Sequence, residues 1–253
     1  MRFLVPFILI LVLMGVVTGQ VKKPQPPPVK TQFAESLQAF VVTTDNDSTI
    51  SGTGRLFERK NPKDKWKSRG DDFPVVLGRT GLAWSSDSAP ENVSVFKKEG
   101  DGKSPAGLFP LTTSFGRGDK AAGISLPYTK LGEYTECVDD VESFHYNKIV
   151  NRLQVGIFDW KSSEKMLEVG PAYDLGINVA YNSYPVVKGN GSCIFLHVWT
   201  DATTGTSGCT AMKREDLQRI LAWANPVQHP YLVQMTESDY KNLRKKWKLP
   251  KIN

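Results

Sequence analysis

The residues best suited to carry chemistry are a cysteine and a histidine that lie close together in the second half of the chain. Cys209 follows Gly208 in the segment TSGCTAM, and His197 lies in the apolar run CIFLHVW. A thiol that meets an imidazole can act as a nucleophile with its base. The glycine permits a close approach of a substrate carbonyl, so the backbone N–H groups of Ser207 and Gly208 are candidate oxyanion donors. The alternative is a packed corner of a core, in which these residues have no chemical role.

The apolar run around His197 predicts a strand with two different faces. Alternate side chains of a strand point to opposite faces, which separates the aliphatic set Ile194, Leu196 and Val198 from the mixed set Cys193, Phe195, His197 and Trp199. We expect the aliphatic set to face the main core and the mixed set to line a cavity. A helix is predicted to begin near Met212 or Lys213, just behind Cys209. Its N-terminus would lower the pKa of the thiol.

The remaining pattern predicts an α+β fold that is mostly β, of the sandwich or barrel kind. Short β-type runs are separated by clusters of glycine, proline, asparagine and aspartate. The predicted strands are LQAFVVTT, FPVVLG, VSVFKK, RLQVGIFDW, DLGINVAYN, CIFLHVW and PYLVQM, whereas EGDGKSPAGLFPL is predicted to be turns throughout. Apolar residues at helical spacing predict a helix over 213–224, and Thr236 is expected to cap a closing helix.

The three cysteines and three histidines offer a rival pairing. Cys137 and Cys193 can form a disulfide that leaves Cys209 free, or all three thiols can be reduced. His145 is a rival base with Cys137 as its partner, but no glycine-rich approach surrounds Cys137. His229 is expected to be a loop residue. No short-spaced ligand pair occurs, so neither a metal nor another cofactor is expected.

The N-terminus is expected to be a targeting segment rather than part of the fold. Residues 1–19 contain Arg2, an apolar run and then small residues, which is typical of a secretory signal; an uncleaved membrane anchor is the alternative. Residues 20–30 form a proline-rich linker, and residues 31–253 are expected to form one domain. The formal net charge is +6, but the basic residues are spread out and follow no nucleic-acid-binding motif, so nucleic acid is not an expected partner.

Two separated stretches resemble one enzyme family. HVW followed by TSGCTAM is similar to the active-site signature of the L,D-transpeptidase catalytic-domain (YkuD-type, ErfK/YbiS-like) family, with Ser207 where many members carry a second histidine. LGRTGLAW and FKKEGDGKSPAGLFPL resemble an earlier stretch of the same family, and ECVDDVESFHYNKIV resembles a segment of one branch. The resemblance covers roughly residues 70–235.

The resemblance implies an exported enzyme of the periplasm, cell wall or cell exterior that acts on peptidoglycan stem peptides. Cys209 would attack the carbonyl before the terminal D-Ala, with His197 as base and no cofactor, and the acyl group would pass to an amine. If water is the acceptor, the same site is a carboxypeptidase; if the thiol is inert, the domain is a wall-binding module. Asp140, Asn147 and Trp199 are candidates for substrate contacts, although turn capping for Asp139 and Asp140 and core packing for Trp199 are the alternatives.

Overall fold

The structure is a computed structural model that describes residues 29–91 and 93–252. The expected signal segment, residues 1–19, and the proline-rich segment up to residue 28 lie outside the described residues. Within the described ranges, no helix has the length and the apolar character that are needed to cross a membrane.

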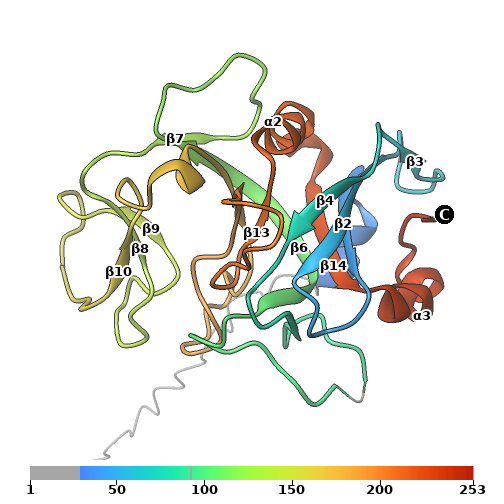
Figure 1. Ribbon diagram of the computed structural model, residues 1–253, viewed down its shortest axis with the longest axis horizontal. Coiled ribbons are helices and arrows are strands. Elements are labelled where there is room, and N and C mark those ends of the chain that lie inside the picture. Colours follow the sequence, from blue (N-terminus) through green and yellow to red (C-terminus); the bar gives the residue numbers. More distant parts are fainter. Residues whose placement is uncertain (1–28, 92, 253) are drawn as a thin grey trace, which may run out of the picture.

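Eight strands close into a barrel, because β1 pairs with β14 on one side and with β2 on the other (Figure 1). The spatial order is β1-β14-β6-β11-β12-β13-β4-β2. The barrel strands are β1 (Gln38–Thr44), β2 (Ser51–Glu58), β4 (Phe73–Val76), β6 (Ser104–Gly116), β11 (Leu175–Val179), β12 (Phe195–Val198), β13 (Thr210–Met212) and β14 (Pro230–Thr236). The prediction of a mostly β fold of the α+β class is confirmed.

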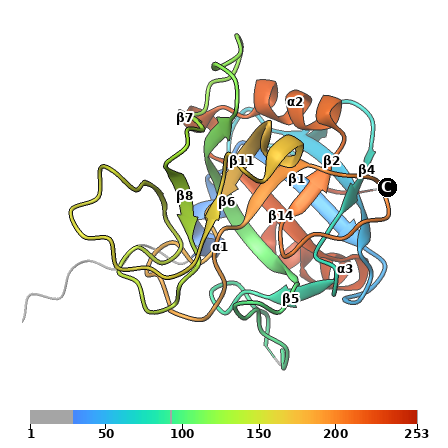
Figure 2. The ribbon, with the colours of Figure 1, turned by 60° about the vertical axis from the view of Figure 1, so that its left-hand side comes forward.

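A second, three-stranded sheet lies beside the barrel on the side away from the C-terminal helix (Figure 2). It contains β8 (Thr135–Val138) between β9 (Ile149–Asn151) and β10 (Ser163–Lys165). Short strands also extend the barrel: β3 (Lys67–Ser68) pairs with β2, while β5 (Leu82–Trp84) and β7 (Tyr128–Lys130) pair with β6. The small sheet matters for function because it reaches the candidate site.

Strand β1 shows why an unbroken apolar run forms a strand here. All of its residues are buried, with Phe40 and Val42 in the main core and Ala39 and Val41 in a second core outside the barrel. A strand that is covered on both faces needs apolar side chains at every position rather than at alternate ones. The second core is completed by α3 (Glu237–Trp247), which packs Tyr240 against the strand.

The two C-terminal helices are confirmed. Helix α2 (Arg214–Trp223) places Leu217, Ile220 and Leu221 in the main core, as the helical spacing predicts. Thr236 caps α3, because its side-chain oxygen accepts a hydrogen bond from the Asp239 N–H at 3.1 Å. The other helices are α1 (Val29–Ala34) and the 3₁₀ turns η1 (Gly170–Tyr173) and η2 (Pro226–Gln228).

Three expectations about the strands were wrong, and some strands were not predicted. The EGDGKSPAGLFPL stretch is not all turn, because β6 begins at Ser104. Pro105 lies near the start of this strand, where the missing N–H of a proline is best tolerated. The runs VSVFKK and RLQVGIFDW were predicted to be strands, but neither forms one of the strands β1–β14. Both runs expose large apolar side chains, such as Phe96 and Ile157. The barrel strands β2 and β13, the second of which follows Cys209 directly, were not predicted.

Candidate active site

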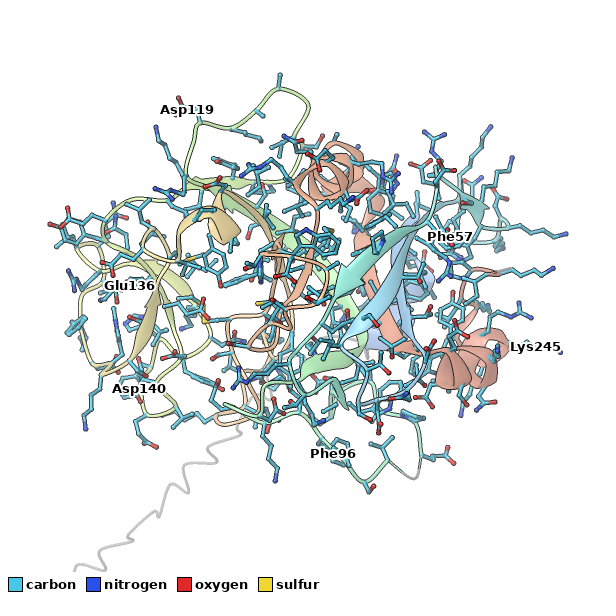
Figure 3. The ribbon with its side chains drawn as sticks, viewed as in Figure 1. Phe57, Phe96, Asp119, Glu136, Asp140 and Lys245 are labelled. Atoms are coloured by element: carbon cyan, nitrogen blue, oxygen red, sulfur yellow. A yellow bond between two sulfur atoms is a disulfide. The ribbon has the colours of Figure 1, made fainter. Side chains whose placement is uncertain are left out.

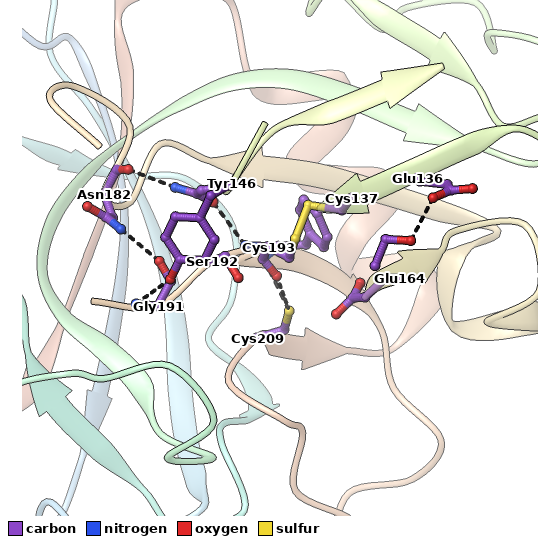
Figure 4. The surroundings of a disulfide bond; sticks show 12 residues. Glu136, Cys137, Tyr146, Glu164, Asn182, Gly191, Ser192, Cys193 and Cys209 are labelled. Atoms are coloured by element: carbon purple, nitrogen blue, oxygen red, sulfur yellow. Dashed lines mark hydrogen bonds between the residues drawn. A yellow bond between two sulfur atoms is a disulfide. The ribbon is translucent and has the colours of Figure 1, made fainter. Parts of the chain in front are cut away.

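Cys209 lies at the end of the loop that leads into β13. Because β12 and β13 run parallel, with Leu196 opposite Thr210, Cys209 lies beside Phe195. The Phe195 N–H donates to the Cys209 sulfur at 3.2 Å, and the thiol donates to the Cys193 carbonyl oxygen at 3.4 Å (Figure 4). Two backbone groups of one neighbouring segment therefore hold the thiol in place.

The predicted cause of thiol activation was wrong. Strand β13 separates Cys209 from α2, which begins only at Arg214, so Cys209 does not lie at a helix N-terminus. Burial raises the pKa of the Cys209 thiol, and the charge of Glu164 raises it further. The resting cysteine is therefore a neutral thiol, and it needs a base when it reacts.

A cavity of about 230 Å³ opens at the Cys209 thiol. Arg79 and Lys97 line it with positive charge, while Glu99, Asp139 and Glu164 line it with negative charge. The remaining lining residues are Gly100, Ser192, Cys193, Ile194, Ser207, Gly208 and Cys209. The cavity thus joins the barrel, which supplies the thiol, to the small sheet, which supplies Glu164.

His197 is oriented by a backbone carbonyl. Its Nδ1 lies 2.8 Å from the Val198 carbonyl oxygen, and because that oxygen only accepts, Nδ1 carries the proton and Nε2 keeps its lone pair. The orienting group is the carbonyl of the next residue along β12. Burial lowers the pKa of His197, so the imidazole is neutral at neutral pH.

Tyr173 lies next to both candidate catalytic side chains. Its ring packs edge-on against His197 with 5.5 Å between centroids, and its hydroxyl interacts with the Cys209 thiol. In the part of the chain that the structure describes, no hydrogen bond joins His197 to Cys209 directly. Catalytic contacts are often long in the absence of substrate and shorten in the complex.

The residues predicted to supply oxyanion donors, Ser207 and Gly208, line the cavity. The Gly208 N–H already donates to Thr206 Oγ1 at 3.1 Å, whereas at Ser207 the side-chain Oγ, and not the backbone N–H, is the bonded group and accepts from Arg79 at 3.1 Å. Gly208 has a φ of +152°, and an added Cβ would lie 3.2 Å from the Lys103 carbonyl oxygen. The glycine is therefore required by the backbone and by the space around it, and its role as a donor stays a prediction.

The three predicted substrate-binding residues do not line the cavity. Asp140 accepts backbone N–H bonds from Glu142 and Lys161, which is the turn capping given as the alternative, and it lies on the small-sheet side of the molecule (Figure 3). The Asn147 side chain bonds to backbone groups of Tyr181, Asn182 and Cys193. Trp199 is half-buried at the end of β12. Their roles in substrate binding stay predictions, and the contacts of Asp140 and Asn147 are structural.

Most of the charged residues that line the cavity were not predicted from the sequence to belong to a site. Arg79, Lys97 and Glu99 lie within the stretches that carry the family resemblance, which was the signal that could have found them. Glu164 lies outside the stretches that carry the resemblance, so no sequence signal marked it. It reaches the cavity because β10 pairs with β8 in the small sheet.

A disulfide joins Cys137 to Cys193, so Cys209 is the free cysteine. This settles which of the two expected cysteine states occurs, and it removes the rival site, since Cys137 has no thiol to offer. His145 instead lies against Trp160, and its Nε2 is 3.1 Å from the Ile157 carbonyl oxygen. Among the described residues, no group of three or more His, Cys, Asp or Glu side chains is placed to hold a metal ion.

Removal of the disulfide is expected to cost about 2–4 kcal/mol of stability, because the bond links residues 56 positions apart. The double substitution Cys137→Ala with Cys193→Ala tests this by urea denaturation, and Cys209→Ala is the matched control that leaves the bond intact. Equal denaturation midpoints for the double variant and the wild type would contradict the prediction.

One of three comparisons with known proteins identifies a family. A family model of the L,D-transpeptidase catalytic domain matches residues 48–234. A search of curated protein sequences finds no match. Among solved structures, the chain is similar to the helical cell shape determining protein Pgp2 from Campylobacter jejuni, with 15% identity and a TM-score of 0.38 over 80% of this chain. The match covers 48% of the Pgp2 chain, so this chain spans about half of it.

Proposed function

Because the chain belongs to the L,D-transpeptidase catalytic-domain family, we propose that it is an exported L,D-transpeptidase that acts on peptidoglycan stem peptides. The observation that carries the proposal is the free cysteine, Cys209, in the lining of a charged cavity. The family match covers both the thiol and the histidine beside it. The neutral imidazole with a free Nε2 supports His197 as the base.

The first half-reaction transfers the stem peptide to the enzyme. The thiol proton passes to Nε2 of His197 while the Cys209 sulfur bonds to the carbonyl carbon that precedes the terminal D-residue. The carbon–nitrogen bond then breaks, and the imidazolium returns its proton to the departing amine. A thioester on Cys209 and a free D-amino acid result.

The second half-reaction releases the enzyme. An amine of a second stem attacks the thioester and gives its proton to His197 as the carbon–sulfur bond breaks. The thiolate of Cys209 takes that proton back from the imidazolium, which leaves a cross-linked product and the starting enzyme. Backbone N–H groups near residues 207–209 are the proposed donors to the oxyanion in both steps.

Intact-mass analysis after incubation with a tetrapeptide-stem disaccharide tests the proposal. The wild type is expected to gain the mass of the stem without its terminal residue and then to form a cross-linked dimer, whereas Cys209→Ala gains nothing. An adduct that yields a tripeptide but no dimer would assign water as the acceptor and make the enzyme a carboxypeptidase. A folded wild type without adduct or product would contradict catalysis and leave a wall-binding module.

A further inference from the structure

The acidic side of the cavity contains two carboxylates that lack a full set of donors. Glu99 accepts hydrogen bonds from Tyr146 and Ser192. In contrast, Oδ1 of Asp139 is buried and has no hydrogen-bond partner, and Glu164 accepts a bond at 2.6 Å from the Tyr173 hydroxyl. A carboxylate has room for about four donors, so Asp139 and Glu164 retain acceptor capacity toward the cavity.

The cations of the cavity do not neutralise these two carboxylates. Lys97 forms an ion pair with Asp101 at 2.8 Å, and its side chain is 3% exposed. Arg79 donates to the Ser207 hydroxyl. The Glu164 side of the cavity is therefore negative while the Arg79 side is positive, and a ligand that complements it carries an ammonium group on one side.

Glu164 is also connected to the nucleophile. The Tyr173 hydroxyl donates to Glu164 and interacts with the Cys209 thiol, so one side chain contacts both groups. Figure 4 shows the Glu164 carboxylate and the Cys209 sulfur on the same side of the disulfide. A negative charge at this position disfavours the thiolate, since two like charges in a buried site raise the pKa of the acid that ionises second.

We propose that Glu164 is a specificity-determining residue: its carboxylate adds to the restraint that burial places on ionisation of the Cys209 thiol, and it accepts an ammonium group of the substrate, which removes the electrostatic part of that restraint. The inference rests on the proposed function and deepens it. Substrate binding would place a positive charge beside Glu164, and the thiolate would then form more readily. The nucleophile would be activated chiefly when a cationic stem peptide occupies the cavity.

The pH dependence follows from the groups around Glu164. Burial raises the pKa of Glu164 to about 7, and the neighbouring Asp139 and Glu99 raise it while the Tyr173 bond lowers it. The charge of Lys97 lowers the pKa of the thiol on the other side. Glu164 therefore opposes ionisation of the Cys209 thiol above pH 7, where its carboxylate is charged. This effect is lost as the pH falls below 7 and the carboxylate is protonated.

Alkylation of the full-length protein by iodoacetamide tests the restraint without any need for transpeptidase activity. At pH 8.5, Glu164→Gln is expected to react at Cys209 about tenfold faster than the wild type, because a neighbouring charge shifts a pKa by roughly one unit or more. At pH 5.5 the two rates should be similar. Glu168→Gln, an exposed glutamate near the same strand, should match the wild type at both pH values. Equal rates for Glu164→Gln and the wild type at pH 8.5 would overturn the inference.

Binding to the Cys209→Ala protein tests the ammonium contact independently of catalysis. A tetrapeptide stem with a free side-chain ammonium is expected to bind about tenfold more tightly than the same stem acetylated at that nitrogen. Adding Glu164→Gln should abolish the difference, as measured by calorimetry. Equal affinities with Glu164 present would overturn the inference even if the enzyme forms cross-links. If alkylation and binding behave as expected but no acyl adduct forms, the proposed function fails and the role of Glu164 stands.

Discussion

The substitution His197→Ala is expected to slow acylation of Cys209 by about 10²- to 10⁴-fold, the usual contribution of a general base. Burial raises the pKa of the Cys209 thiol, so almost no thiolate exists at neutral pH without a base. His197 lies on the same face of β12 as Phe195, which lies beside Cys209, and its Nδ1–H bond to the Val198 carbonyl keeps Nε2 available. The measurement is the single-turnover rate of adduct formation followed by mass.

The pH profile and a matched variant make this prediction specific. Because burial lowers the pKa of His197 below its ordinary value of 6.5, the wild-type rate should hold down to about that pH and fall only at lower pH. His145→Ala is the control, since its ring lies against Trp160 and its nearest cysteine is in a disulfide. A normal rate in His197→Ala, or a loss in His145→Ala that matches it, would refute the assignment.

The substitution Glu136→Ala is expected to destabilise the protein by about 3 kcal/mol, because it removes hydrogen bonds to a charged group, worth about 1.5–3 kcal/mol each, and leaves a buried donor without an acceptor. Glu136 is fully buried in β8, on the small-sheet side of the molecule (Figure 3). Its carboxylate accepts hydrogen bonds from Lys165 at 2.6 Å, Trp160 at 2.8 Å and Ser163 at 2.6 Å. Alanine would leave the Trp160 N–H without its acceptor and Lys165 without its counter-charge. Urea denaturation measures the loss.

The pH dependence of that loss has a defined sign. Burial opposes ionisation of Glu136, but the bonds from Lys165, Ser163 and Trp160 outweigh it and hold the pKa of Glu136 below its ordinary value of 4.5. The stabilisation is therefore present above pH 4.5 and is lost as the pH falls further. The control is Glu142→Ala, an exposed glutamate near the same sheet, which should change stability by less than about 0.5 kcal/mol. A Glu136→Ala protein as stable as this control at pH 7 would refute the prediction.

The sequence by itself determined the class of fold and the two helices that close the chain. Leu217, Ile220 and Leu221 recur at helical spacing, and Thr236 precedes its helix with a side chain that caps it. These signals are local, because they depend on residues within one or two turns of each other. The separation of Ile194, Leu196 and Val198 into the main core was likewise readable from alternation alone. Cys209 and His197 were also proposed as the reactive pair from short local segments, TSGCTAM and CIFLHVW.

Only the tertiary structure decided the state of the thiol and the composition of its cavity. Whether Cys137 bonds to Cys193 depends on how close a strand of the small sheet lies to the end of β12, which no spacing reveals. The same packing brings Glu164 and Tyr173 to Cys209 from distant parts of the chain. Local sequence placed the helix behind Cys209 within about one residue of its observed start, but it did not reveal that residues 210–212 pair with β12 as a strand and so separate the thiol from that helix. The pKa of a buried group depends on its surroundings in space, so it cannot be read from neighbours in the chain.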